Sequence, residues 1–198
     1  MREYVAIVAK ALLEAKGLLI GEFTLSSGKK SFYYLDLGTL LSKPELLDLI
    51  SNLVCVEVKR RGVPDYIVGV PYRGLPIAIC TSLKLNIPCL MVRKERKEHG
   101  TKKAIEGVFK EGCAAIIDDV ATTGGSIAKT VDLLRGEGLE VSYALVVVDR
   151  MEGARDLLKE KGVELYSLVD IIELADYLLE IEEINDYTYK RIRKQFKI

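Results

Sequence analysis

The 198-residue sequence has no surplus of charge of either sign, because 29 Lys and Arg residues balance 29 Asp and Glu residues. A chain without a basic surplus is not expected to bind nucleic acid or an anionic membrane through its overall field. The sequence also lacks an apolar run of the roughly 20 residues that a membrane span needs. Residues 1–17 mix charged and apolar side chains and show no cleavage site, which indicates an amphipathic helix rather than a signal peptide. We therefore expect a cytoplasmic protein with no nucleic-acid or membrane partner, in which any anion site is local.

Cysteine is present without the spacing of a metal site. No C-x-x-C pair occurs among the four widely spaced residues Cys55, Cys80, Cys89 and Cys113. Each lies in an apolar stretch, so we expect four small buried hydrophobic side chains in the reduced form. The sequence predicts no zinc site.

Short apolar strands alternate with amphipathic helices along most of the chain. This alternation predicts βαβ units and an α/β fold with a parallel twisted sheet flanked by helices. The expected helices cover residues 3–16, 42–61, 75–85, 126–135, 152–161, 170–180 and 182–196, with Ser42 as the cap of the second. The expected strands cover residues 18–25, 31–37, 66–70, 89–92, 113–117, 141–148 and 164–169.

The N-terminal segment 1–41 is predicted to form a small hood subdomain on an α/β core of residues 42–198, the two acting as a single domain. Ligands of parallel sheets bind at the carboxyl ends of the strands. The loops that begin at that edge are 71–74, 93–107, 118–126 and 149–153, and we expect the functional residues there.

The most informative motif is a buried strand that ends in two acids and runs into a glycine-rich turn before a helix. Its residues are Asp118, Asp119, Val120, Ala121, Thr122, Thr123, Gly124, Gly125 and Ser126. Loop N–H groups at a helix N-terminus form a cradle for an anion, and glycine allows a phosphate to approach closely. Two carboxylates would repel a bare phosphate, but they suit the hydroxyls of a ribose 5-phosphate. The alternative is a capped turn with solvated acids; the motif matches neither the P-loop nor G-x-G-x-x-G.

Loop 93–107 carries many cations around the only histidine, His99. They are Arg93, Lys94, Arg96, Lys97, Lys102 and Lys103. Gly100 and Gly107 bracket the second half of the loop, so the segment suits a lid over a polyphosphate, whose leaving charge it would stabilise. For His99 we favour contact with pyrophosphate or proton transfer. The alternative is a solvated charged loop.

Three further positions are candidates at neighbouring strand ends. Tyr72 and Arg73 follow a short strand and could bind pyrophosphate oxygens, or form an ordinary turn with a surface arginine. Arg150 follows another strand, and its guanidinium matches a ligand carboxylate bidentately. Its alternative is a salt bridge to Asp149 or Glu152. Tyr34 and Leu35 could cover a planar base, or simply pack in the core.

The strand, acids, turn and helix together resemble the type I phosphoribosyltransferases, whose 5-phosphoribosyl-1-pyrophosphate (PRPP) motif has this layout. The resemblance narrows to orotate phosphoribosyltransferases through residues 23–34, residues 93–100 and Val148-Asp149-Arg150. It implies transfer of the 5-phosphoribosyl group from PRPP to orotate, which gives orotidine 5′-monophosphate and pyrophosphate for pyrimidine biosynthesis. The alternatives are a purine-type phosphoribosyltransferase and a non-catalytic PRPP-binding regulator.

The resemblance also implies residue roles. The catalytic residues would be Asp118, Asp119, Lys97 and His99. PRPP would be bound by Tyr72, Arg73, Arg93, Lys94, Lys97, His99 and residues 118–126, and orotate by Thr122, Arg150 and Tyr34. Mg²⁺ is expected as the cofactor, held by substrate oxygens and water with no direct protein ligand. A homodimer is implied, in which loop 93–107 reaches the neighbouring site. One departure is Ser26, which stands where many members have a lysine; Lys29 and Lys30 are near but not equivalent.

Overall fold

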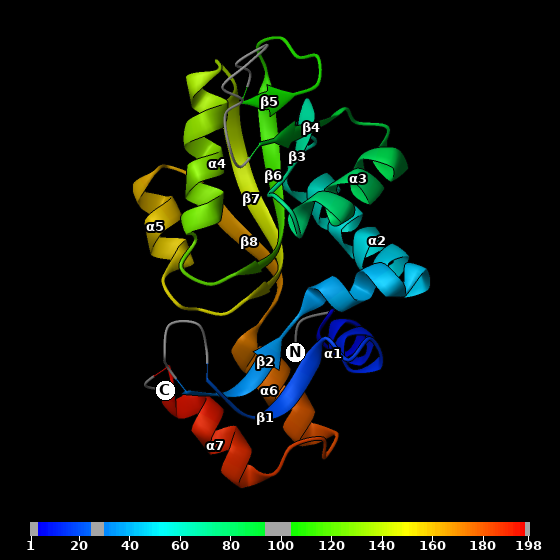
Figure 1. Ribbon diagram of the computed structural model, residues 1–198, viewed down its shortest axis with the longest axis vertical. Helices are drawn as coiled ribbons and strands as arrows, with labels where there is room; N and C mark the ends of the chain where they lie inside the picture. The colour runs from blue at the N-terminus through cyan, green and yellow to red at the C-terminus, as the bar shows by residue number, and fades with distance from the viewer. Residues whose placement is uncertain (1–3, 25–29, 94–103, 197–198) are drawn as a thin grey trace.

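The computed structural model describes residues 4–24, 30–93 and 104–196. A six-stranded sheet in the order β5-β4-β3-β6-β7-β8 forms the centre, and helices cover both of its faces (Figure 1). The strands are β3 (Tyr66–Gly69), β4 (Cys89–Val92), β5 (Ile105–Glu106), β6 (Cys113–Ala121), β7 (Glu140–Asp149) and β8 (Glu164–Asp170). All neighbouring pairs are parallel except β4 and β5. The expected α/β fold with a parallel sheet flanked by helices is confirmed.

Side chains from the two faces of this sheet enter two separate hydrophobic cores. In β6, Ala115 and Ile117 face one core and Ala114 and Ile116 face the other, because successive strand residues point to opposite sides. The first core is covered by α1 (Val5–Glu14), α2 (Pro44–Arg61), α3 (Gly74–Leu85) and α6 (Ile171–Glu180). The second is covered by α4 (Gly125–Gly136) and α5 (Ala154–Glu160). Burial on both faces explains why the middle segments of β6 and β7 are apolar.

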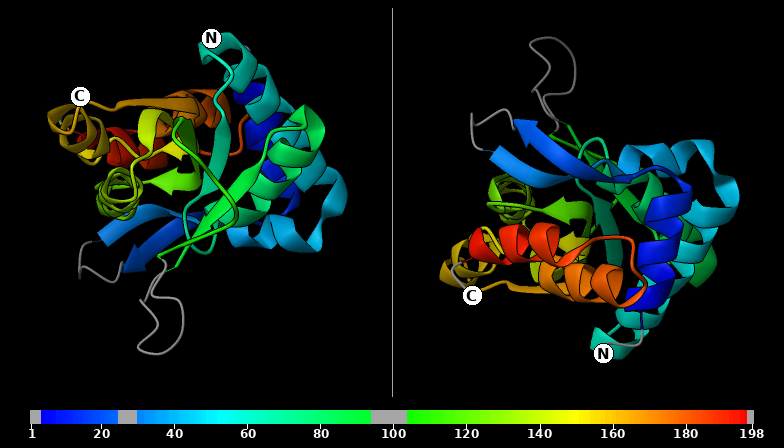
Figure 2. Two further views of the ribbon diagram at one scale, coloured as in Figure 1. Left: turned by 90° about the horizontal axis from the view of Figure 1, so that it is seen from above. Right: turned by 90° about the horizontal axis from the view of Figure 1, so that it is seen from below.

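Strands β1 (Leu18–Thr24) and β2 (Lys30–Leu35) form a separate antiparallel pair beyond one end of the large sheet. Of the C-terminal helices, α6 packs against α1, and α7 (Asp186–Lys194) packs against α6 and β2 (Figures 1 and 2). Arg191 of α7 stacks on Phe32 of β2, with 4.4 Å from its guanidinium carbon to the ring centroid. Both ends of the chain therefore contribute to the lobe that contains β1 and β2, and the division at residue 41 stays a prediction.

Several expected local features were wrong. Ser42 does not cap α2; it ends a 3₁₀ helix, Leu37–Ser42, and Lys43 is the N-cap, with no side-chain capping bond. The reason is Pro44, which keeps the preceding residue out of the helical region, so the helix can start no earlier. Cys55 is buried, but Cys80, Cys89 and Cys113 are only partly buried, although all four are free.

The charged loop also contains more structure than its composition indicated. Ala104 and Ile105 are buried, and Ile105 and Glu106 form β5 against β4. Strand β6 continues four residues past its expected end at Ile117, as far as Ala121. None of the helices in the described ranges is long and apolar enough to cross a membrane.

Candidate active site

Asp118 and Asp119 lie inside the paired part of β6 and not in the loop after it. Asp118 is paired with Val146 of β7, whereas β3, on the other side, is paired only as far as Ile117. The two acids are therefore buried, with exposed fractions of 7% and 6%, at the point where one neighbouring strand has ended. The edge predicted to bind ligands thus carries both acids within the sheet, and Asp118 lines the adjoining cavity.

Burial raises the pKa of Asp118 well above its usual range, and the neighbouring charge of Asp119 raises it further. Burial also raises the pKa of Asp119, opposed by the Val120 N–H that donates to its Oδ1 at 2.8 Å. Asp118 Oδ1 accepts from the Asp119 N–H at 2.9 Å. Two desolvated acids side by side favour a partner that offers hydroxyl hydrogens or positive charge.

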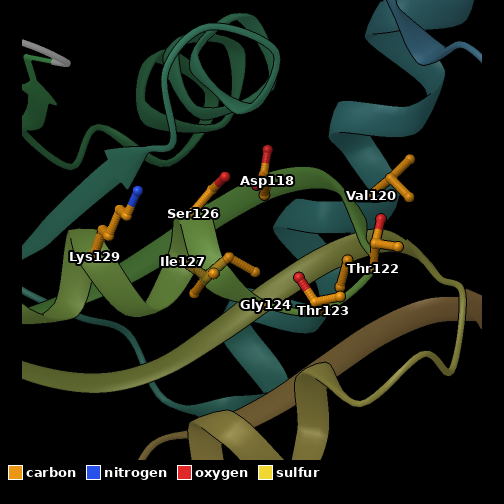
Figure 3. Close-up of a pocket in the computed structure, with 10 residues that line it drawn as sticks. Asp118, Val120, Thr122, Thr123, Gly124, Ser126, Ile127 and Lys129 are labelled. Carbon is orange, nitrogen blue, oxygen red and sulfur yellow. The ribbon is translucent and has the colours of Figure 1, made fainter. Parts of the chain in front are cut away.

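The turn after β6 lines a cavity of about 290 Å³, together with Asp118 and Lys129 (Figure 3). Thr122, Thr123 and Ser126 bring hydroxyls to it. The first N–H groups of a helix have no partner within the helix. Here the Ala128 N–H donates to the Gly124 carbonyl at 2.8 Å, so the N–H groups before it face the turn. Such a turn can hold a phosphate.

The two glycines of the turn have different roles. Gly124 has a φ of +79° as the N-cap of α4, and a Cβ there would lie 3.0 Å from the Ala154 Cα. Both the left-handed backbone and the contact with α5 therefore favour glycine. At Gly125 an added Cβ would meet only the Thr123 hydroxyl, at 3.9 Å. Its missing side chain leaves room on the cavity side.

Lys129 is a cavity residue that the sequence analysis missed. It lies one helical turn after Ser126, so the two side chains share a face of α4 (Figure 3). The sequence did contain a signal for it, because Lys129 follows Ser126, the last residue of the motif, by three positions in the predicted helix. A cation at this position adds to the favourable field of the helix N-terminus for an anion.

The loop after β3 lies directly against the end of β6. A Cβ at Gly74 would lie 2.3 Å from the Ile117 carbonyl oxygen and 2.9 Å from Asp118 Oδ1. The peptide bond between Pro71 and Tyr72 is cis, and Tyr72 is 70% exposed. The charge of Arg73 lowers the pKa of both acids, against the effect of burial. The structure thus brings Arg73 to the acid pair, and it places Tyr72 as an exposed residue of the same loop.

Arg150 lies at the end of β7, next to the turn. Its N–H donates to the Ala121 carbonyl at 2.8 Å, and its Nη2 forms an ion pair with Glu152 at 2.8 Å. The salt bridge considered as an alternative therefore exists. Within the described residues, its buried Nε has no hydrogen-bond partner.

The aromatic neighbour of Arg150 is Tyr33, which the sequence analysis did not single out. The guanidinium carbon lies 5.0 Å from the Tyr33 ring centroid. Burial raises the pKa of Tyr33 to about 12. Tyr34 points to the other side of β2, is 38% exposed and packs on Phe23, whereas Leu35 is buried in the core. The alternation of side chains along a strand predicts that Tyr33 and Tyr34 face opposite sides of β2. Only the fold shows which of the two sides meets Arg150.

Of the lid residues predicted to bind PRPP, Arg93 is the one that the structure describes. Its N–H donates to the Ala104 carbonyl at 2.9 Å, and its side chain forms an ion pair with Glu106. The predicted roles of Lys94, Lys97 and His99 lie outside the described residues, as does the departure at Ser26. Among the described residues, no group of three or more His, Cys, Asp and Glu side chains could hold a metal ion.

Comparison with known proteins agrees with this architecture. Residues 37–165 match the phosphoribosyl transferase domain family, and this region contains the acid pair, the turn and Arg150. The fold and the site thus define a phosphoribosyltransferase.

Individual relatives narrow the class. The orotate phosphoribosyltransferase of Saccharolobus solfataricus is 43% identical over 186 residues, 93% of each chain. That of Methanocaldococcus jannaschii is 43% identical over 82% of this chain and 92% of its own. The crystal structure of orotate phosphoribosyltransferase from Aeropyrum pernix has a TM-score of 0.79 and 38% identity, covering 90% of this chain and 99% of that one. UMP synthase of Leishmania donovani has a TM-score of 0.86 and 34% identity over 97% of this chain, which spans 42% of that protein. The chain belongs to the orotate phosphoribosyltransferase family.

Proposed function

We propose that this protein transfers the 5-phosphoribosyl group from PRPP to orotate, giving orotidine 5′-monophosphate and pyrophosphate in pyrimidine biosynthesis. The observation that carries the proposal is the direct continuity between two buried acids and the cavity-lining turn of residues 120–126. One strand end can thereby take the diol and the phosphate of the same ribose. Relatives named orotate phosphoribosyltransferase, with about 40% identity over most of the chain, support the choice of acceptor.

The donor is bound at the end of β6. Asp118 and Asp119 accept hydrogen bonds from the ribose hydroxyls, which add donors to two desolvated carboxylates that each accept one backbone N–H. The N–H groups and hydroxyls of the turn hold the 5-phosphate, and Lys129 adds a positive charge at the cavity. Tyr72 and Arg73 take the pyrophosphate from the neighbouring loop, together with Arg93, Lys94, Lys97 and His99.

The chemistry consists of breaking the bond between ribose C1 and the pyrophosphate oxygen and joining C1 to the acceptor nitrogen. Bond breaking runs ahead of attack, so positive charge develops on the ring and negative charge on the leaving group. Asp118 and Asp119 lie beside the developing ring cation, and the cations of loops 71–74 and 93–107 stabilise the leaving pyrophosphate. Catalysis thus comes from positioning and electrostatics, with no protein nucleophile. Lys97 and His99 are proposed to act from loop 93–107, closed as a lid over the site.

Orotate is oriented by Arg150 and Thr122, whereas Tyr34, on the opposite face of β2 from Tyr33, is proposed only to cover the base. The Arg150 guanidinium is buried, and Tyr33 and Glu152 hold it on two sides. An arginine held in one orientation can pair with a planar carboxylate through two parallel N–H groups. The N-terminal segment 1–41 is proposed to cover the base as a hood, with Tyr34 as its half-exposed aromatic side chain.

Mg²⁺ fits this site as a companion of the substrate. Asp118 is the single carboxylate among the described residues that line the cavity, too few to hold the ion without the oxygens of PRPP. When bound, the ion would neutralise charge on the pyrophosphate. We further propose a cytoplasmic homodimer in which loop 93–107 of one subunit completes the site of the other.

The direct test is an assay of orotate consumption with PRPP and Mg²⁺, followed through the ultraviolet absorbance of orotate. Pyrophosphate release should match orotate loss, and adenine, guanine and hypoxanthine should leave PRPP intact. Purine-dependent pyrophosphate release without orotate turnover would assign the protein to a purine-type enzyme. PRPP binding by calorimetry without any turnover would make it a regulator.

A further inference from the structure

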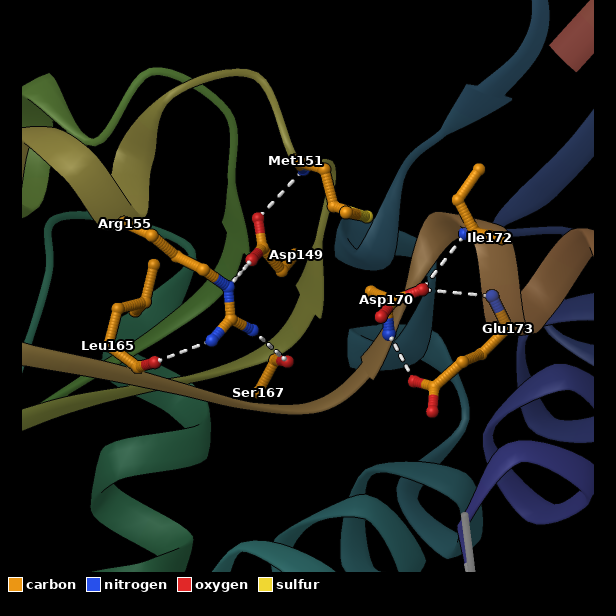
Figure 4. A network of polar contacts seen from close by, with 8 residues as sticks. All are labelled: Asp149, Met151, Arg155, Leu165, Ser167, Asp170, Ile172 and Glu173. Carbon is orange, nitrogen blue, oxygen red and sulfur yellow. Dashed lines mark hydrogen bonds and ion pairs between the residues drawn. The ribbon is translucent and has the colours of Figure 1, made fainter. Parts of the chain in front are cut away.

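A polar network around Asp149, the residue before Arg150, takes no part in the proposed chemistry (Figure 4). Asp149, the last residue of β7, is completely buried. Its two carboxylate oxygens have different partners: Oδ2 accepts from Arg155 Nε at 2.6 Å, and Oδ1 accepts from the Met151 N–H at 2.8 Å. A buried carboxylate is costly unless it is paired in this way. Arg155 supplies the positive charge that pairs with Oδ2, so Oδ1 remains available to accept from the Met151 N–H.

The backbone that Asp149 holds is the turn that carries Arg150. Met151 has a φ of +56°, a left-handed conformation that is uncommon for a residue other than glycine. The bond from its N–H to Asp149 stabilises this conformation. The turn also brings Arg150 and Glu152 together as an ion pair, although they are two residues apart. The orientation of the Arg150 guanidinium therefore depends on the turn at Met151.

Arg155 is itself fixed at three points. Beyond Asp149, its Nη1 donates to the Leu165 carbonyl and its Nη2 to the Ser167 hydroxyl, both at 3.1 Å on β8 (Figure 4). The side chain borders a separate hollow between α2 and β8, which shares no lining residue with the cavity of the turn. Arg155 thus lies outside the substrate cavity, and among the described residues it reaches Arg150 through Asp149.

We propose that Arg155 is a positioning residue for the acceptor base: through Asp149 it fixes the left-handed turn that orients Arg150. The inference rests on the proposed role of Arg150 in binding orotate. If a residue acts only through Arg150, its substitution changes the KM for orotate and leaves the KM for PRPP unchanged. Such a substitution also has no further effect on the KM for orotate in a variant that already lacks Arg150.

The test compares Arg155→Met, Arg150→Ala and the double variant with the wild type, with KM measured separately for orotate and PRPP. Arg155→Met is expected to raise the KM for orotate about tenfold and to change that for PRPP less than about twofold. Arg155→Lys, which keeps a cation beside Asp149, should recover much of the loss. Lys161→Met is the matched control, because it removes a cation paired with Asp132 at the far end of α5.

The double variant decides between positioning and mere stability. If Arg155 acts through Arg150, the double variant has the orotate KM of Arg150→Ala alone. Additive losses, or a fall in kcat with both KM values unchanged, would overturn the proposal. Should Arg155→Met fail to fold, Ser167→Ala removes one Arg155 contact without uncovering Asp149, and a smaller rise in the orotate KM is then required.

The same experiment separates this inference from the proposed function. No orotate turnover by the wild type would overturn the proposed function. An unchanged orotate KM in Arg150→Ala would remove the basis for the role of Arg155. Active wild type, a raised orotate KM in Arg150→Ala and no change in Arg155→Met would overturn the positioning role alone.

Discussion

Arg73 Nη1 lies 2.7 Å from Asp36 Oδ1 and so joins the loop after β3 to a residue 37 positions earlier in the chain. Asp36 Oδ1 also accepts from the Gly38 N–H at 3.0 Å, at the start of the 3₁₀ helix. One carboxylate oxygen therefore caps the 3₁₀ helix and also fixes Arg73, the side chain that we propose binds pyrophosphate. The placement of Arg73 beside the acid pair depends on residues far away in the sequence.

This contact leads to a stability prediction. Asp36→Asn keeps an acceptor for Gly38 but loses the charge, so it should cost no more than about 1 kcal/mol, since exposed ion pairs contribute little. Asp36→Ala also loses the cap and should cost about 1 kcal/mol more. Urea unfolding of both variants measures the difference, and equal losses would show that the cap does not contribute.

Asp118→Asn should stabilise the free protein near neutral pH while lowering its rate of transfer. Burial and the charge of Asp119 raise the pKa of Asp118 from its ordinary 3.8, so the native state retains a proton that the unfolded chain has released. Stability therefore falls as the pH rises from the unfolded-state pKa through the raised native pKa. An uncharged amide avoids this loss.

Urea unfolding between pH 4 and pH 8 should show a flatter profile for Asp118→Asn than for the wild type. Initial rates should fall about 10²-fold or more, as when a charge-stabilising group is lost. Asp132→Asn, which changes an exposed acid on α4, is the control and should alter neither property greatly. A variant less stable than the wild type at every pH would contradict the prediction.

Gly74→Ala should destabilise the protein by about 1–3 kcal/mol, as expected for an added methyl group without room. The new Cβ would meet backbone atoms of Ile117 and Asp118, which cannot move without displacing the end of β6. Gly136→Ala is the control, because nothing lies within 4 Å of its added Cβ. That change should stabilise α4 by about 0.4–1 kcal/mol. Thermal unfolding with and without PRPP measures both effects; only Gly74→Ala should lose stabilisation by PRPP.

Arg150→Ala should weaken orotate binding by about 1.5–3 kcal/mol, the usual contribution of hydrogen bonds to a charged group. PRPP binding should persist, because no described contact joins the Arg150 side chain to the cavity of the turn. Arg191→Ala, which removes the guanidinium stacked on Phe32, is the matched control. Calorimetry with each substrate separates the two affinities; equal loss of both would remove Arg150 from the base site.

Mixing Lys97→Ala with Asp118→Asn tests the shared site. If loop 93–107 of one subunit serves its partner, subunit exchange between these two nearly inactive dimers creates one intact site in each mixed dimer. Random exchange should then restore about a quarter of the wild-type activity, as follows from two-fold symmetry. Mixing each variant with itself is the control. No recovery after confirmed exchange would show that each subunit supplies its own Lys97.

The sequence by itself determined the fold class and the local order of the motif that we propose binds the donor. Strand and helix periodicity is local, and so is the order of acids, glycines and hydroxyls that turns from β6 into α4; each can be recognised within about ten residues. The family resemblance adds the acceptor for the same reason, because it rests on short continuous segments such as Val148-Asp149-Arg150.

Only the tertiary structure decided which distant side chains meet at the site. It places Tyr33 rather than Tyr34 against Arg150, Asp36 on Arg73 and Arg155 on Asp149, and it packs α7 beside β2. These contacts depend on strand order, on which face of a strand is turned inward and on the packing of both chain ends into one lobe. Each is set by long-range packing, for which local periodicity carries no signal.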